Sequence, residues 1–416
     1  MPDLEADLFN LAMSEQAQPL MDAVKKHIAE NIEPITEEFF SLDKEKEDRW
    51  SWHPRQLELL EGAKDKAKES GLWNFFLPGY SEIGEGLTNL DYAYIATELG
   101  KYALASESLN CSAPDTGNME VLERVGTEAQ KEQWLKPLLN GDIRSAYAMT
   151  EPGLPSSDAK NISTSAVLDG DEWVINGEKF YISGAGDPRC KIMITMVKTD
   201  PDAAPSKQQS QILVPIETPG VQILEGMEVF GHDHAPRGHM HIKFDNVRVP
   251  KENILLGVGR GFEISQVRLG PGRIHHCMRS IGKAEKALEL MVKRSATREA
   301  FGKPIAKLGK NLEVISRARI EINAMRLAVL QAAKAMDVLG NKEARVYVSA
   351  VKAMVPEKVC LIIDQAIQMH GAAGISQWTP LAEMYTDLRH LRFADGPDEV
   401  HHMVVGRAEL QRYDLW

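Results

Sequence analysis

The spacing of apolar residues changes twice along the 416-residue chain, and this change restricts the possible folds more than any other feature. In the first part Leu20, Val24, Ile28 and Ile32 recur every four residues after Pro19, which is helical spacing. From about residue 144 the pattern turns to short alternating runs broken by turn signals, which is typical of strands. Helical spacing returns near residue 261. The sequence therefore predicts helices, then a β-domain, then helices again.

Turn and cap residues refine the first region, residues 1–143. Thr88 or Asn89 is a suitable N-cap for a helix over 91–99, and Gly100 is a suitable end for it. A second short helix is expected over 130–139, where an Asn-Gly pair follows. We expect this region to form an N-terminal helical domain.

The middle region, residues 144–260, contains several candidate strands. The run Asp169-Gly170-Asp171 predicts a hairpin turn, and Asn176-Gly177 predicts a second one. Further strands are expected over 191–197, 211–215 and 239–244. Short strands with tight turns predict a compact β-domain.

The last region, residues 261–416, carries long amphipathic patterns over 281–298, 312–339 and 342–370. Long helices with short connections predict a helical bundle. The expected fold class is therefore α+β, mainly α.

Charge and composition limit the possible partners and compartments. The net charge of −12 disfavours binding to nucleic acid, because an acidic surface repels phosphate backbones. No run approaches the roughly 18 apolar residues that a membrane span needs. The four cysteines form no CxxC pair, and residues 1–10 lack the apolar segment of a signal peptide. We expect a cytoplasmic protein.

Four histidines in one short segment are a candidate metal site. His232, His234, His239 and His241 form two His-x-His pairs, and on a strand each pair would share one face. Histidines at a surface turn are ordinary, however. We expect no metal.

Several runs combine residue types that suit a cofactor and a carboxyl base. Residues 145–152 read SAYAMTEP, residues 175–183 read INGEKFYIS, and residues 387–396 read DLRHLRFADG. Two shorter runs are REAFGK at 298–303 and QMHGAAG at 368–374. Singly these are an ordinary hairpin, an ordinary helix end and a glycine turn. Their order and spacing make them informative.

Together these motifs resemble the signatures of the acyl-CoA dehydrogenase family, closest to the subgroup of family members 10 and 11. The resemblance covers nearly the whole chain. It implies a helical domain over 1–143, a β-barrel-like domain over 144–260 and a four-helix bundle over 261–416. It also implies FAD as cofactor and the conversion of an acyl-CoA thioester to trans-2-enoyl-CoA.

The resemblance assigns roles to individual residues. Asp395 would be the base that removes the α-proton, at a position where many relatives have Glu. The substrate would lie near Ser157, Arg273 and Gly396. The implied FAD contacts are Tyr147, Met149, Thr150, Ser157, Tyr181 and Ser183, with Arg298, Phe301, Gln368, Gly371 and Ala372 facing a neighbouring chain's FAD, and Asp398 or Glu399 near the adenine end.

The resemblance also implies partners, and it leaves alternatives open. FAD contacts shared between chains imply a homodimer or homotetramer, and an electron-transfer flavoprotein is the expected electron acceptor. Nitroalkane oxidases share this scaffold and use an Asp base. Acyl-CoA oxidases, DNA-binding relatives and a flavin-free helical scaffold are further alternatives. The acidic charge disfavours the DNA-binding relatives.

Overall fold

The computed structural model describes residues 7–77, 79 and 84–415. Residues 1–6, part of the stretch that lacks a signal-peptide pattern, lie outside the described residues. Packing groups the chain into two compact units: unit 1 is Met1–Pro34, Lys66–Ser106 and Gly270–Trp416, and unit 2 is Ile35–Asp65 and Glu107–Leu269. The three-domain division along the sequence is a partition of another kind and stays a prediction.

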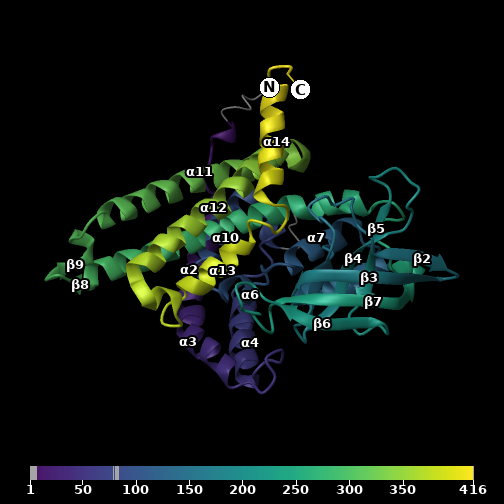
Figure 1. Cartoon of the computed structure of the whole chain (residues 1–416), viewed down its shortest axis with the longest axis horizontal. Coiled ribbons are helices and arrows are strands. Elements are labelled where there is room, and N and C mark those ends of the chain that lie inside the picture. The colour runs from purple at the N-terminus through teal and green to yellow at the C-terminus, as the bar shows by residue number, and fades with distance from the viewer. Residues whose placement is uncertain (1–6, 78, 80–83, 416) are drawn as a thin grey trace. The chain divides into compact units, whose positions relative to one another are not determined.

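Unit 1 is mainly helical, and its long C-terminal helices lie alongside one another (Figure 1). Helix α12 packs against α11, α13 and α14, and α11 also packs against α5. No helix in the described ranges is both long and apolar enough to cross a bilayer. The helices that contribute to unit 1 are α2 (Ala17–His27), its π-helical extension (Ile28–Ile32), α5 (Asn89–Leu99), α10 (Gly261–Thr297), α11 (Asn311–Glu343), α12 (Arg345–His370), α13 (Leu381–His390) and α14 (Asp398–Gln411).

The expected cap of α5 is confirmed. The Thr88 side chain accepts a hydrogen bond from the Asp91 backbone N–H at 3.0 Å, and the Asp91 carboxylate reaches back to residue 88. Such a capping box satisfies two of the backbone donors that a helix start leaves open. Gly100 is the C-cap, as expected.

Helix α10 begins far earlier than expected, at Gly261 instead of near residue 281. Gly270, Pro271 and Gly272 interrupt the sequence pattern, yet the helix continues through them. Proline costs a backbone hydrogen bond, but burial of Ile264, Ile274 and other apolar residues on either side stabilises the helical path.

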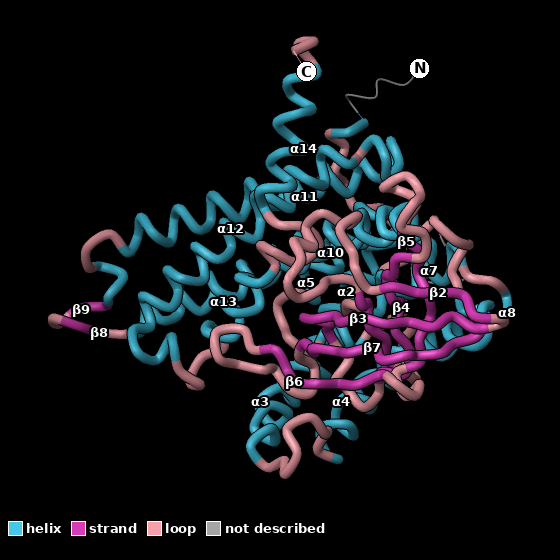
Figure 2. The backbone as a smooth tube through the Cα atoms, turned by 45° about the vertical axis from the view of Figure 1, so that its right-hand side comes forward, coloured by secondary structure: helices cyan, strands magenta, loops and turns pink. Residues whose placement is uncertain are grey.

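Unit 2 contains one sheet of seven strands, drawn in magenta in Figure 2. The strand order is β1-β4-β2-β3-β7-β6, and β5 pairs with β4. The strands are β1 (Arg144–Ala148), β2 (Ser165–Asp169), β3 (Glu172–Ser183), β4 (Cys190–Lys198), β5 (Gln209–Pro215), β6 (Val221–Met227) and β7 (His239–Pro250). The helices that contribute to this unit include α3 (Glu33–Ser41), α4 (Pro54–Glu69), α6 (Ala105–Ser108), α7 (Asp115–Val125), α8 (Glu128–Gln130) and α9 (Lys136–Asn140).

One predicted turn is confirmed and the other is wrong. Asp169 pairs with Glu172, so Gly170 and Asp171 form the hairpin turn between β2 and β3, with Gly170 at φ +65°. Asn176 and Gly177 instead lie inside β3, at an irregularity in its pairing with β7. A Cβ on Gly177 would meet the Thr164 side chain at 2.5 Å, so glycine here permits a close approach and does not end the strand.

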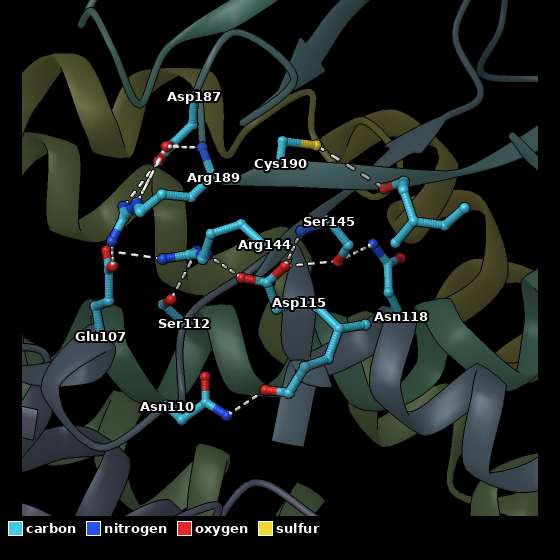
Figure 3. A network of polar contacts seen from close by, with 12 residues as sticks. Glu107, Asn110, Ser112, Asp115, Asn118, Arg144, Ser145, Asp187, Arg189 and Cys190 are labelled. Carbon is cyan, nitrogen blue, oxygen red and sulfur yellow. Dashed lines mark hydrogen bonds and ion pairs between the residues drawn. The ribbon is translucent and has the colours of Figure 1, made fainter. Parts of the chain in front are cut away.

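A buried network of charges fixes the start of β1 (Figure 3). The Arg144 guanidinium contacts Glu107 at 2.8 Å and also pairs with Asp115. Asp115, at the start of α7, accepts hydrogen bonds from the Ser145 backbone N–H and hydroxyl, both at 2.6 Å. Arg189 joins Glu107 at 2.7 Å. The network therefore ties the first residues of β1 to α7 and to the segment before β4.

Candidate active site

The first group of predicted site residues lies in unit 2, where β1 ends beside β3. The Thr150 hydroxyl donates to the Phe180 carbonyl at 2.6 Å, and the Phe180 backbone N–H donates to the Thr150 carbonyl at 3.0 Å. Met149 and Thr150 are both half-buried. The end of β1 and strand β3 therefore place Thr150 next to Phe180.

A buried ion pair lies directly behind these residues. Lys179 Nζ contacts Glu151 at 2.8 Å and donates to the Met149 carbonyl at 2.9 Å. Glu151 also accepts hydrogen bonds from the backbone N–H groups of Ser163 and Thr164, at 2.7 and 2.9 Å. The sequence motifs contain both charged residues, but nothing in their spacing showed that they pair.

Burial and pairing act on the two charges in different ways. Burial alone would raise the pKa of Glu151, but Lys179 and the surrounding donors lower that pKa to about 2. Burial lowers the pKa of Lys179 to about 8, while Glu151 opposes the change. Glu151 is therefore ionised at neutral pH and held in place from several sides.

Tyr181 and Ser183 follow on the same strand, where its pairing with β7 is irregular, and both contact His239. The Tyr181 ring is 42% exposed, its φ is +54°, and its hydroxyl donates to the Glu228 carbonyl at 3.1 Å. The Ser183 hydroxyl lies 2.8 Å from His239 Nδ1. The exposed Tyr181 ring and the Ser183 hydroxyl, both in contact with His239, offer an aromatic face and a neutral polar group to a planar polar ligand.

Tyr147 and Ser157 are the remaining predicted site residues of unit 2. The Tyr147 hydroxyl lies 3.1 Å from the Ser265 hydroxyl and accepts a hydrogen bond from Gln211 at 3.0 Å, and the Arg268 guanidinium lies 3.9 Å from its ring centre. That hydroxyl is thus engaged within unit 2. Ser157 is exposed, whereas the neighbouring Ser156 accepts a hydrogen bond from the Glu151 backbone N–H at 3.0 Å.

The second group lies in unit 1, around the loop between α13 and α14. Asp395 adopts φ +56° and Gly396 φ +104°, so both occupy the left-handed half of backbone space. For a residue other than glycine this conformation is costly, and it persists only where the surroundings enforce it. A Cβ on Gly396 would lie 2.9 Å from His401 Nε2, so only glycine fits there without displacement.

Three basic side chains hold this loop through its backbone carbonyls. Arg273 Nε donates to the Asp395 carbonyl at 2.8 Å, and His401 Nε2 lies 3.3 Å from the same oxygen. Lys352, which is fully buried, donates to the Leu391 carbonyl at 2.6 Å and the Gly396 carbonyl at 3.2 Å. We call Arg273, Lys352 and His401 the loop clamp. They come from α10, α12 and α14.

The Asp395 carboxylate points toward α10. Its Oδ2 lies 3.3 Å from His276 Nε2, and a Cβ on Gly272 would lie only 3.2 Å from the same oxygen. Burial lowers the pKa of His276, and Asp395 opposes that change. The partly buried Asp395 carboxylate lies beside the neutral His276 ring and near the cationic side chains of Arg273 and Lys352. A carboxylate in such a setting is equipped to remove a proton from a bound ligand.

The remaining predicted residues of unit 1 other than Asp398 are exposed, and all but Asp398 and Glu399 lie far from this loop in the chain. Arg298 and Phe301 lie at the short hairpin of β8 (Glu299–Ala300) and β9 (Lys303–Pro304), and the Phe301 side chain is 94% exposed. Gln368, Gly371 and Ala372 are exposed at the end of α12, where Gly371 has φ +62°. Glu399 is exposed, whereas Asp398 is buried and bonded to Arg392 at 2.6 Å.

The four histidines of the candidate metal site make separate contacts with other side chains or with one another. His241 contacts Glu178 at 3.1 Å, His239 contacts Ser183, and the rings of His232 and His234 lie 4.9 Å apart. In the part of the chain that the structure describes, no three His, Cys, Asp or Glu residues form a group that could hold a metal ion.

Sequence reasoning missed the residues that support the site. Lys352 gave no signal, because its role depends on contacts between helices distant in sequence. The adjacent pair His401-His402 was a usable signal, since only one of two neighbouring helical residues can face the Asp395 loop, and His401 does so while His402 is exposed. The adjacent pair His275-His276 was a usable signal: on a helix its members point in different directions, and only one can face the Asp395 loop. The structure shows that His276 does so, whereas His275 packs its ring against Tyr92 with centroids 4.8 Å apart.

Comparison with known proteins gives a consistent family. Sequence models of the acyl-CoA dehydrogenase N-terminal, middle and C-terminal domains match residues 14–142, 146–247 and 259–410. The chain is 54% identical to the probable acyl-CoA dehydrogenase FadE2 of Mycobacterium tuberculosis over 355 residues, which is 85% of this chain and 86% of the relative. It is 50% identical to mouse acyl-CoA dehydrogenase family member 10 over 94% of this chain.

The match to the mouse protein covers only 37% of that relative, and the match to mouse family member 11 covers 52% of it. The chain therefore spans about half the length, or less, of these curated relatives. Among solved structures, a putative acyl-CoA dehydrogenase from Mycobacterium abscessus matches with a TM-score of 0.93 and 46% identity, over 97% of this chain and 100% of that one. On these matches, the chain belongs to the acyl-CoA dehydrogenase family.

Proposed function

We propose that this protein converts an acyl-CoA thioester to a trans-2-enoyl-CoA, with Asp395 as the base that removes the α-proton. The observation that carries the proposal is the Asp395 loop: a carboxylate held in a costly backbone conformation by the loop clamp. Such an arrangement is expected where the position of one side chain matters for chemistry.

The residues present in unit 2 fit a flavin. The family uses FAD, whose isoalloxazine ring accepts the hydride from the substrate β-carbon when it is bound. The ring face of Tyr181 and the neutral groups of Thr150 and Ser183 suit a planar heterocycle on which negative charge grows, since no carboxylate is among these three. We assign FAD contacts to Tyr147, Met149, Thr150, Ser157, Tyr181 and Ser183, and contacts to a neighbouring chain's FAD to Arg298, Phe301, Gln368, Gly371 and Ala372, with Glu399 near the adenine end.

The unit 1 residues act on the substrate in this proposal. Asp395 takes the α-proton, and its backbone N–H, together with Gly396, lies near the thioester. Arg273 uses Nε for the loop, so a contact to coenzyme A would come from its two Nη groups. Asp is one methylene shorter than Glu, and Ala394 is small. We therefore expect an acyl group bulkier than a short straight chain.

The partners and location are part of the same proposal. Exposed Phe301, Gln368 and Ala372 suit contacts with a second copy, in a homodimer or homotetramer. We expect an electron-transfer flavoprotein as the acceptor and a cytoplasmic location. In the longer curated relatives, the region that matches this chain is joined to further sequence.

An anaerobic titration tests the proposal. The purified protein with FAD is mixed with straight, branched and hydroxylated acyl-CoA esters while its visible flavin absorbance is followed. Bleaching by a CoA ester, lost in Asp395→Asn, is the expected result. Reduction by a nitroalkane with no response to any CoA ester would replace the proposal with an oxidase of the same fold, and a protein that takes up no FAD would end it.

A further inference from the structure

We propose that His276 is a positioning residue for the base: a neutral imidazole that donates a hydrogen bond from Nε2 to Asp395 Oδ2. This bond would keep the carboxylate ionised and oriented to receive the substrate proton. The inference rests on the proposed function, since it assigns a role relative to Asp395. It goes beyond it by naming a second residue, with a defined protonation state.

The contacts on the two ring nitrogens determine the tautomer. His276 Nε2 lies 3.3 Å from Asp395 Oδ2, and His276 Nδ1 lies 3.3 Å from Arg279 Nη2. A guanidinium can only donate, so Nδ1 must accept and cannot carry a proton. The single proton of the neutral ring is then on Nε2, and it points to the carboxylate.

Helix α10 supplies this arrangement through its periodicity. Arg273, His276 and Arg279 are each three residues apart, so they follow one another along one side of the helix. Gly272 adds no side chain between the helix and the carboxylate, whose Oδ2 would lie 3.2 Å from a Cβ at that position. The helix therefore approaches Asp395 closely where His276 is placed.

The charged surroundings favour the neutral ring. Burial lowers the pKa of His276, with Arg279 and Lys352 acting in the same direction and Asp395 opposing. Groups that interact with Asp395 include Arg273 and His276 from α10, Lys352 from α12 and His401 from α14. Arg279 acts on His276, and Asp398 from α14 acts on Lys352. Because the cations favour an imidazole without extra charge, His276 contributes a hydrogen bond to the base without competing for its proton.

The proton inventory of the step is simple. The substrate Cα–H bond breaks, its electron pair stays on the thioester as an enolate, and the proton forms a bond to the Asp395 carboxylate. His276 keeps its own Nε2–H bond throughout. A hydrogen bond to the ionised carboxylate lowers the pKa of that carboxyl group, so removal of the donor raises it.

A pH profile tests this role. The rate of anaerobic flavin bleaching by an active acyl-CoA is measured from pH 5 to 9 in wild type, His276→Leu and His276→Gln. His276→Leu should move the acidic limb upward by about one to two pH units, the shift expected for losing a hydrogen bond to a charged group. His276→Gln, whose amide can donate at similar reach, should restore most of the wild-type profile. His402→Gln, an exposed histidine on α14, is the matched control and should leave the profile unchanged.

A second readout does not depend on turnover. Long-range proton–nitrogen NMR correlation on histidine-labelled wild-type protein reports the tautomer of each ring, and the signal absent in His276→Gln identifies residue 276. A proton on Nε2 alone at pH 7 is expected. A proton on Nδ1, or on both nitrogens, would overturn the inference even if His276→Leu failed to fold.

The outcomes separate this inference from the proposed function. If Asp395→Asn bleaches like wild type, Asp395 is not the base, and the inference loses its role together with the proposed function. If Asp395→Asn is inactive while His276→Leu keeps the wild-type acidic limb, the base stands and the positioning role of His276 is wrong.

Discussion

The two groups of site residues are held in opposite ways. In unit 2 the buried ammonium of Lys179 pairs with the buried carboxylate of Glu151. In unit 1 the buried ammonium of Lys352 donates to two backbone carbonyls of the Asp395 loop. In the first arrangement the charges of Lys179 and Glu151 cancel, and the residues proposed to contact the ligand are neutral. Among the described residues, the second leaves a basic side chain unpaired with any one carboxylate, close to both Asp395 and Asp398.

This difference matches the chemistry proposed for each group. Neutral contact residues backed by a cancelled pair place no fixed charge against a ligand ring, so that ring can gain negative charge without opposition. Burial lowers the pKa of Lys352 and of Arg273, and Asp395 opposes that change. In their charged forms these side chains favour an ionised Asp395 and an enolate that forms beside it. The two groups of residues thus use buried lysines for structure in one case and for the electrostatics of a base in the other.

The largest expected effect comes from breaking the pair in unit 2. Lys179→Met leaves the Glu151 carboxylate buried without its cation, and removal of one partner from a buried pair costs about 3–5 kcal/mol of unfolding free energy. Chemical denaturation measures it. Lys191→Met, which removes an exposed pair with Glu217 in the same sheet, should cost at most about 1 kcal/mol. Equal losses in the two variants would mean that the buried pair is not the main support of this group.

Breaking the lysine contact in unit 1 should instead change the reaction rate. Lys352→Met removes the donor from the Leu391 and Gly396 carbonyls, so the Asp395 loop loses its fixed position, and a misplaced base can lower the rate about 10²-fold. Stopped-flow flavin bleaching measures it. Lys358→Met is the control, because Lys358 lies on the same helix as Lys352 and forms an exposed pair with Glu321 of α11. A wild-type rate in Lys352→Met would show that this lysine does not fix the position of the base.

A smaller effect is expected from acid. The pKa of His401 is lowered from 6.5 to about 4, because burial disfavours the imidazolium and Arg273 and Lys352 are nearby. Between these values the unfolded chain binds a proton that the folded chain does not, so the unfolding free energy falls as the pH drops through this window. His401→Gln should remove about 1–3 kcal/mol of that fall in unfolding experiments at pH 4 to 7. An unchanged slope would show that His401 titrates normally.

Local rules predicted the elements well where the residues themselves carry the signal. The Thr88 cap follows from short-range hydrogen bonding, and the hairpin at Gly170 follows from its positive φ. Gly100 ends its helix with φ −65°, and there the close approach of the Arg279 backbone requires glycine. Asn176-Gly177 has the same composition as a turn but lies within β3, because a close approach to Thr164 also requires glycine. Helix α10 runs through Pro271 because tertiary packing outweighs the local penalty.

The site was predictable where a motif names a residue and not where packing assigns its role. Asp395, Thr150 and Ser183 were selected from their motifs, and the structure places Thr150 and Ser183 in unit 2 and Asp395 in unit 1. Lys352 and His401 reach the Asp395 loop from separate helices, a convergence that no spacing in the sequence encodes. The motif residues Glu151 and Lys179 were visible in the sequence, but their pairing needed the register of β1 against β3.

Exchange of the substrate α-hydrogen tests the central claim most directly, because it reports proton removal without requiring the electrons to leave. An acyl-CoA that the protein binds is incubated in D2O, and mass spectrometry follows deuterium at the α-carbon. Rapid exchange in wild type, reduced about 10²- to 10⁴-fold in Asp395→Asn, is the result predicted for a general base. Exchange at the wild-type rate in Asp395→Asn would show that another group removes the proton.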